Sequence, residues 1–160
     1  TPLYSSAASD VYKRQMLLLT SLAGCSGLPN PLANSLEGTI GSSEDLNFDE
    51  VQVRRFATGE IEVRYVRNKD GNSEVVAKVT VKTPTEGISY GREIELLSND
   101  GVISRAVQDA EDFPELKSGS ITIDAGGIKA GDATRGKFAA VFMNDKTIKG
   151  TFEADLTMVE

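Results

Sequence analysis

The feature that most constrains the fold of this 160-residue chain is an alternation of apolar and polar residues with a period of two. It is clearest in residues 60–65, where Ile61, Val63 and Tyr65 would share one face and three charged residues would share the other. An extended chain places alternate residues on opposite faces, so this pattern predicts a β-strand with one buried and one solvated face.

The same alternation recurs along the chain and predicts about nine strands. Their expected bounds are 36–42, 51–56, 60–65, 75–82, 94–97, 102–107, 121–124, 137–143 and 147–158. Pairs that tolerate a positive φ, such as Asp70-Gly71 and Gly126-Gly127, lie between them and would close hairpins. We therefore predict an all-β domain over residues 36–160: an antiparallel β-sandwich, with a small β-barrel as the alternative.

Helices are not expected to contribute to this domain. The best candidate, residues 106–116, contains Pro114, which would remove a backbone hydrogen bond and clash with the preceding turn. We predict a loop or a single short turn in this segment.

Composition excludes several classes of function. The 17 Lys and Arg against 24 Asp and Glu give a net charge of −7, which repels phosphate backbones, so no nucleic-acid partner is expected. The chain has no His, which removes the commonest general base and a common zinc ligand. Nothing in the sequence locates a carboxylate pair for glycoside hydrolysis. We expect no enzymatic activity and assign no catalytic residue.

The single cysteine follows a short apolar run that begins at Met16. The tetrapeptide Leu22-Ala23-Gly24-Cys25 resembles the lipobox of bacterial lipoproteins. The resemblance implies that a diacylglyceryl group is attached to the Cys25 thiol and that the signal peptide is cut after Gly24. The alternative is a short buried helix or strand in which Cys25 is an ordinary small apolar residue. We expect no cofactor apart from the covalent lipid.

A lipid on Cys25 would place the domain in the bacterial cell envelope. No stretch of about 20 apolar residues is present, so the lipid would anchor the protein without a membrane-spanning segment. In Gram-negative lipoproteins Asp after the cysteine commonly signals retention in the inner membrane. Ser26 occupies that position, which implies sorting to the outer membrane. Residues 25–35, with Pro29 and Pro31, would form a tether that holds the domain in the periplasm or at the cell surface.

The first fifteen residues have a different character. The hexapeptide at 10–15 resembles the in-frame translation of a transposase end sequence used in sequencing libraries. We therefore expect residues 1–15 to be an artefact and residues 16–24 to be a truncated lipoprotein signal peptide. The natural start is expected to lie upstream.

Two loops carry candidate ligand residues. Asp109, Glu111 and Asp112 could offer carboxylate oxygens to Ca²⁺, although a solvated surface loop is favoured because the residue order of a preformed calcium loop is absent. Residues 124–132 contain three Gly and two Asp, which could indicate a phosphate cradle or a calcium turn. A long hairpin loop is the favoured interpretation there.

The last two predicted strands repeat a Gly-x-Phe motif, at residues 136–138 and 150–152. With residues 119–124, this pattern resembles uncharacterised lipoprotein β-sandwiches of Gram-negative bacteria. Packing is the expected role, because Gly leaves room for a neighbouring ring; a ligand contact is the alternative.

Charged residues on the solvated strand faces are expected to form cross-strand pairs that stabilise the domain. The arginines are Arg54, Arg55, Arg64, Arg67, Arg92, Arg105 and Arg135, and their expected partners are Glu60, Glu62, Glu93 and Glu95.

Two functions are consistent with the sequence. The first is a structural or protein-interaction module of the envelope, anchored by lipid, which predicts a filled core. The second is a lipoprotein that binds a small apolar ligand or Ca²⁺, which predicts an internal cavity or a calcium site.

Overall fold

The computed structural model describes residues 33–83 and 87–160, which lie in one compact unit, Pro31–Glu160. The predictions for the artefact (1–15), the signal peptide (16–24), the lipobox (Leu22, Ala23, Gly24 and Cys25) and Ser26 all lie outside the described residues.

Nine strands and two short 3₁₀ helices make up the described chain, which confirms the all-β prediction. The strands are β1 (Ser35–Glu37), β2 (Glu50–Phe56), β3 (Glu60–Lys69), β4 (Asn72–Lys82), β5 (Glu93–Glu95), β6 (Val102–Ala106), β7 (Leu116–Ala125), β8 (Ala133–Phe142) and β9 (Thr147–Val159). The 3₁₀ helices are η1 (Thr39–Ser42) and η2 (Leu97–Asn99).

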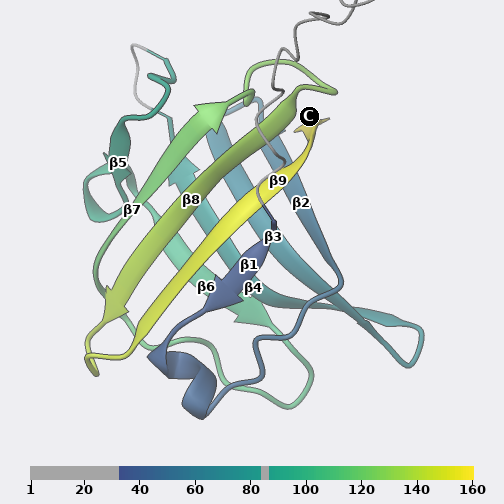
Figure 1. Ribbon diagram of the computed structural model, residues 1–160, viewed down its shortest axis with the longest axis vertical. Helices are drawn as coiled ribbons and strands as arrows, with labels where there is room; N and C mark the ends of the chain where they lie inside the picture. The colour runs from purple at the N-terminus through teal and green to yellow at the C-terminus, as the bar shows by residue number, and fades with distance from the viewer. Residues whose placement is uncertain (1–32, 84–86) are drawn as a thin grey trace, which may run out of the picture. The chain divides into compact units, whose positions relative to one another are not determined.

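The strands form one mixed sheet that is curled into a half-barrel. Their order is β5-β7-β8-β9-β2-β3-β4-β6, and β1 pairs with β9 as well. In Figure 1, β7, β8 and β9 cross in front while β2, β3, β4 and β6 lie behind. The prediction of an antiparallel sandwich is not confirmed, because the strands belong to one sheet and because β2 and β9 run parallel, with Val53 opposite Leu156.

Strand β9 joins the two halves of the curled sheet because its two edges pair with different strands. One edge pairs with β8 from Thr147 to Asp155. The other edge pairs first with β1, where Leu36 lies opposite Gly150, and then with β2, where Phe56 lies opposite Val159. A strand of 13 residues spans both regions.

The core lies between the front and the back of the half-barrel. The residues predicted to face inward on β3 and along most of β4 are buried there, and so are the aromatic side chains of β8 and β9. The largest fully buried side chains include Tyr65, Phe142, Phe152, Ile61, Ile121, Ile123 and Ile148. The inner space is therefore filled with side chains.

The predicted strand 36–42 is wrong beyond residue 37, because the chain leaves the sheet at Gly38 and forms η1. Gly38 has a φ of 152°, and a Cβ there would lie 2.1 Å from the Thr147 carbonyl oxygen. The backbone of Thr39 instead donates to the Thr147 hydroxyl. The prediction of a loop after residue 106 is confirmed, because residues 107–115 contain no helix.

Candidate functional site

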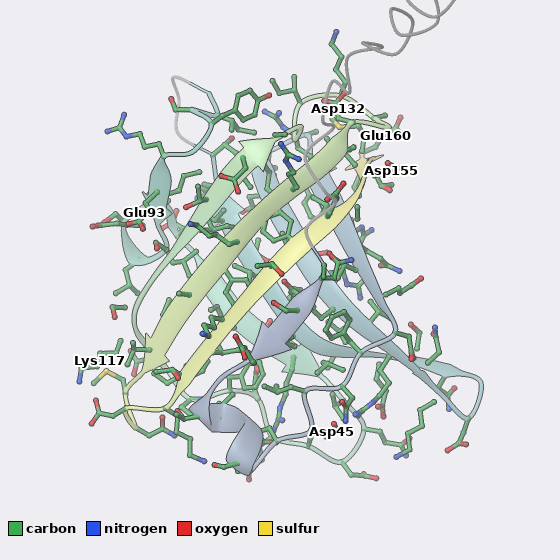
Figure 2. All side chains as sticks on the ribbon, viewed as in Figure 1. Asp45, Glu93, Lys117, Asp132, Asp155 and Glu160 are labelled. Carbon is green, nitrogen blue, oxygen red and sulfur yellow. The ribbon has the colours of Figure 1, made fainter. Side chains whose placement is uncertain are left out.

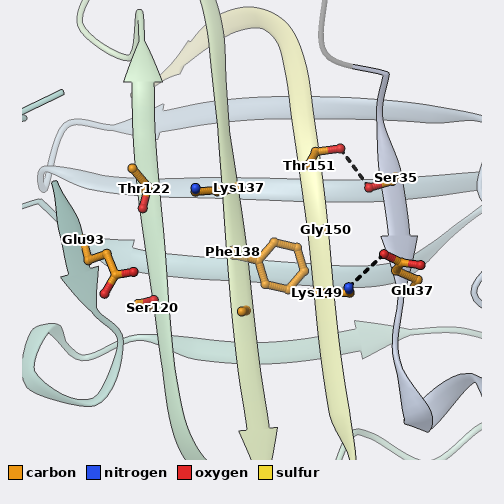
Figure 3. A pocket seen from close by; sticks show the side chains of 11 residues that line it. Ser35, Glu37, Glu93, Ser120, Thr122, Lys137, Phe138, Lys149, Gly150 and Thr151 are labelled. Carbon is orange, nitrogen blue, oxygen red and sulfur yellow. Dashed lines mark hydrogen bonds and ion pairs between the residues drawn. The ribbon is translucent and has the colours of Figure 1, made fainter. Parts of the chain in front are cut away.

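A groove of about 270 Å³ lies on the outer face of the front strands. Its side chains come from β5, β7, β8, β9 and β1 (Figure 3). The lining residues include Ser35, Glu37, Glu93, Ser120, Thr122, Lys137, Ala139, Lys149, Gly150 and Thr151.

The floor of the groove is low because small side chains of β7 and β8 lie opposite each other. Ala139 lies opposite Ser120 on one side and opposite Lys149 on the other. Gly150 lies opposite Phe138, whose ring points into the core but also lines the groove. A row of small side chains between longer ones produces a depression on a strand face, since side chains stand perpendicular to the sheet.

Fixed polar contacts form the wall on the β1 side. The Lys149 Nζ lies 3.1 Å from the Glu37 Oε1, and the hydroxyls of Ser35 and Thr151 are 2.8 Å apart; both contacts are dashed in Figure 3. Glu93 lies on the opposite side, at the start of β5. The groove is therefore bordered by an acid on one side, an ion pair on the other and several hydroxyl groups.

A second hollow, of about 690 Å³, continues from this groove along the outer face. The two share Glu93, Ser120, Ala139 and Lys149, and the second extends to Leu97 at the start of η2. Leu97 is 57% exposed, so an apolar side chain stands at the end of an otherwise polar depression. Together the two hollows form a long indentation on the outer face of β7, β8 and β9.

The chemistry of this surface is suited to binding. Its hydroxyls, carboxylates and ammonium groups can donate and accept hydrogen bonds, and its floor can receive the side chains of another molecule. It is open on the outside of the domain, unlike the enclosed sites that surround most small ligands.

Buried side chains occupy the inside of the half-barrel. Tyr65 packs against Phe48 and Phe138, with ring centroids 5.0 and 5.9 Å apart. Its hydroxyl donates to the Thr151 carbonyl across the core, at 3.0 Å. Burial raises the pKa of the Tyr65 phenol above its ordinary value, so the phenol keeps its proton and remains a donor.

The Gly-x-Phe motifs fill the rest of this interior, as expected from packing. Gly136 lies opposite Phe152, and Phe138 lies opposite Gly150. A Cβ on Gly136 would lie 2.7 Å from the Phe152 ring, and one on Gly150 would lie 2.6 Å from the Phe138 ring. Each glycine therefore leaves the space that a phenylalanine of the neighbouring strand occupies.

The acidic loop does not form a calcium site in the described residues. Asp112 accepts from the backbone N–H groups of Arg105 and Phe113, at 2.9 and 2.7 Å. Across residues 33–83 and 87–160, no group of three or more Asp, Glu or Cys side chains is arranged to hold a metal ion. The observed contacts of Asp112 hold the loop along β6.

Residues 124–132 connect β7 and β8, as the hairpin prediction required. The Asp132 carboxylate accepts from the backbone N–H groups of Ile128 and Lys129, at 3.3 and 2.8 Å. These N–H groups are therefore already engaged by a carboxylate within the loop. Figure 2 shows Asp132 at the opposite end of the half-barrel from Lys117.

Among the described residues, one of the predicted cross-strand arginine–glutamate pairs forms, between Arg54 of β2 and Glu62 of β3. Glu62 also lies within ion-pair distance of Arg64, which is on its own strand. Arg55 instead donates to the Gly127 carbonyl, and Arg105 pairs with Glu44. The alternation pattern predicted which strand faces carry charge. It did not predict that Arg55 and Arg105 would bind residues in loops.

Arg67 connects the segment before β2 to the back strands. Its guanidinium pairs with Glu74 at 2.8 Å and also with Asp45. The hydrogen bond from Arg67 lowers the pKa of the Glu74 carboxyl. The backbone N–H of Asn47 and the charge of Arg67 both lower the pKa of Asp45. The ionised carboxylates of Glu74 and Asp45 therefore stabilise the folded state.

The groove was missed at the sequence level. The available signal was a set of small or hydroxyl residues at alternate positions of two strands, Ser118 and Ser120 in β7 and Ala139 in β8. This signal becomes meaningful only when the register between the strands is known, because the register aligns the small residues.

Comparisons with known proteins found no matching family model, no matching curated protein and no matching solved structure. Among the described residues, no helix has the length and apolar character needed to cross a bilayer.

Proposed function

We propose that this chain is a lipid-anchored module of the bacterial cell envelope that binds another protein on the outer face of β7, β8 and β9. The observation that carries this proposal is the contrast between a filled interior and an indented exterior. A carrier of small apolar molecules would need the space that Tyr65, Phe138 and Phe152 occupy.

The anchor rests on the lipobox at Leu22, Ala23, Gly24 and Cys25, with Ser26 favouring the outer membrane. The folded domain begins close behind the proposed tether. The carbonyl of Ala33 accepts from Thr151, and the side chain of Asn34 accepts from the Glu153 backbone. The end of the tether is thus fixed beside the groove-bearing strands, two residues earlier than the sequence-based bound of 35.

The anchor is tested by mass spectrometry of the mature protein from the bacterium that encodes it. The expected N-terminal peptide begins at Cys25 and carries a diacylglyceryl group. Cys25→Ser is expected to leave the membrane fraction, because the acyl chains supply the binding energy. A free Cys25 thiol in the mature protein would refute the anchor.

The binding surface is tested by placing a photo-crosslinking amino acid at Ala139, in the groove floor. The matched control places it at Ala133, which is exposed on the same strand and the same face but does not line the groove. We expect a discrete adduct in living cells from position 139 and none from position 133. Equal adducts from both positions, or none from either, would contradict the proposed surface.

Occupancy of the groove gives a second readout. Ala139→Arg would fill the floor, whereas Ala133→Arg adds the same side chain outside the groove. We expect only Ala139→Arg to abolish the interaction with the crosslinked partner, while both variants keep the unfolding temperature of the wild type within a few degrees.

A further inference from the structure

A cationic cluster lies on the outer face of the back strands, and the proposed function does not use it. Its centre is Glu62 of β3, whose side chain is only 10% exposed. Three cations surround this carboxylate: Arg54 Nη1 at 3.3 Å, Arg64 Nε at 3.8 Å and Lys78 Nζ at 4.0 Å. They come from β2, β3 and β4, where Arg54 lies opposite Glu62 and Arg64 lies opposite Lys78.

The cluster has more positive charge than its single carboxylate can balance. Three cations and one anion leave a local charge of +2 on a chain whose net charge is −7. The Arg64 Nε is buried and makes no hydrogen bond, since its nearest carboxylate oxygen is at 3.8 Å. Each guanidinium has five N–H donors, so the cluster retains unused donor capacity.

Two acids at the starts of these strands do not pair with the cluster. Glu50 and Glu60 are the first residues of β2 and β3. Glu50 accepts from Gln52, at 2.6 Å, and Glu60 accepts from Thr58, at 3.4 Å. Neither forms an ion pair with the cluster among the described residues.

The surroundings of the cluster resemble the centre of a protein-binding surface. The Arg54 guanidinium lies 5.6 Å from the centroid of the Phe56 ring. Val102 of β6 is 53% exposed and lies opposite Thr80, in the same cross-strand row as Glu62. Partly buried arginines beside exposed apolar groups are enriched where proteins bind one another.

We propose that this face of β2, β3 and β4 binds an acidic, extended segment of a partner protein. Glu62 holds the three cations together, and carboxylates of the partner bind their outward-facing donors. A guanidinium matches a planar carboxylate with two parallel hydrogen bonds. The inference goes beyond the proposed function, because it requires neither the lipid anchor nor the groove on the front strands.

The exposure of the cations favours a protein segment over a lipid surface. The side chains of Arg54, Arg64 and Lys78 are 31%, 28% and 37% exposed, because they are drawn toward Glu62. Segments that bind anionic bilayers carry clusters of freely projecting Lys and Arg, whereas these cations lie recessed on a strand face.

The test uses the full chain and a fluorescent peptide of about twelve residues in which Glu and Thr alternate, so that its carboxylates lie about 6.7 Å apart on one side when extended. Binding is measured by anisotropy at about 0.15 M salt, where the screening length is about 8 Å. The expected result is saturable binding of this peptide and none of the matched Lys-Thr peptide. Absence of binding by the acidic peptide would overturn the proposal.

Variants locate the binding to the cluster. Arg54→Gln with Lys78→Gln is expected to weaken binding about tenfold, since two charge pairs are lost. Arg92→Gln with Lys129→Gln removes the same charges from exposed positions outside the cluster and is expected to weaken binding less than about twofold. Equal weakening by both double variants would overturn the site.

Two further measurements keep the test decisive if the first double variant folds poorly. Glu62→Gln removes the internal competitor for the cations, and we expect it to tighten peptide binding about threefold; weaker binding by a folded Glu62→Gln would contradict the proposal. The second measurement uses phosphatidylcholine vesicles containing about one-third phosphatidylglycerol. Cluster-dependent binding to these vesicles but not to the acidic peptide would assign the face to a membrane and overturn the proposal.

Discussion

The hairpins β8–β9 and β3–β4 both fill the core, but they do so by different means. In β8–β9, glycine lies opposite phenylalanine at two successive inward positions, Gly136 with Phe152 and Gly150 with Phe138. In β3–β4, β-branched residues lie opposite each other, as Val63 does with Val79. The first arrangement depends on the space that each glycine leaves for a ring of the paired strand. The second is ordinary packing between β-branched side chains.

The outer faces of the two hairpins differ as well. Small residues on the front strands leave the groove around Ala139, whereas the back strands carry the ion cluster around Glu62. One half of the molecule therefore presents a depression and the other presents charge. The following predictions test this difference between the two hairpins, beginning with the largest expected effect.

The largest effect on stability is expected at a glycine that leaves space for a neighbouring ring. Gly136→Ala would place a Cβ 2.1 Å from the Thr122 carbonyl oxygen and 2.7 Å from the Phe152 ring. We expect a loss of about 3 kcal/mol in the free energy of unfolding, measured in urea, against about 1 kcal/mol for Val63→Ile in the back hairpin. A larger loss for Val63→Ile would invert the comparison.

The next effect concerns a buried hydrogen bond between the two halves, from Tyr65 of β3 to Thr151 of β9. Tyr65→Phe removes the donor to the Thr151 carbonyl and should cost about 1 kcal/mol. Tyr90→Phe is the matched control, because the Tyr90 hydroxyl donates to the Gly126 carbonyl from an exposed position. Equal unfolding free energies for both variants would show that the buried bond stabilises the fold no more than the exposed one.

A pH-dependent effect is expected on the back strands. The pKa of Glu74 is lowered in the folded state, so its carboxylate stabilises the fold above the unfolded pKa of about 4.3. This stabilisation is lost as pH falls through the folded-state pKa. Glu74→Gln should therefore be less stable than the wild type at pH 7, with the difference closing toward about pH 3. Thermal unfolding across this range measures it, and a difference that grows on acidification would contradict the assignment.

The smallest effect is expected at the groove wall. Lys149 and Glu37 form an ion pair whose side chains are both about two-thirds exposed. Lys149→Ala should change the unfolding free energy by less than about 0.5 kcal/mol. A loss above about 1 kcal/mol would mean that the wall of the groove stabilises the fold, rather than being available for binding.

The sequence predicted the strands well because period-two burial is a local signal. Ile61, Val63 and Tyr65 are buried as expected. Strand ends were less accurate: β7 begins at Leu116, five residues before its predicted start at 121. The alternating residues 121–124 allowed the strand to be predicted. The Ser and Gly residues before them show no alternation of apolar and polar side chains.

Features that depend on non-local pairing could not be predicted. The parallel pairing of β2 with β9 joins segments about one hundred residues apart. A register shift after Tyr65 leaves Val76 without a direct partner, which no local pattern indicates. Glu62 was predicted on a solvated face, yet cations from β2, β4 and its own strand cover it.

A domain with a filled interior binds its partners on the outside. Thermal unfolding of the wild type with and without benzene tests whether the interior is filled, because benzene binds dry apolar cavities in protein cores. Phe152→Ala serves as the positive control because it removes a fully buried ring. We predict that benzene raises the midpoint of Phe152→Ala and leaves that of the wild type unchanged. A rise in the wild-type midpoint would reveal an internal binding cavity and contradict the account.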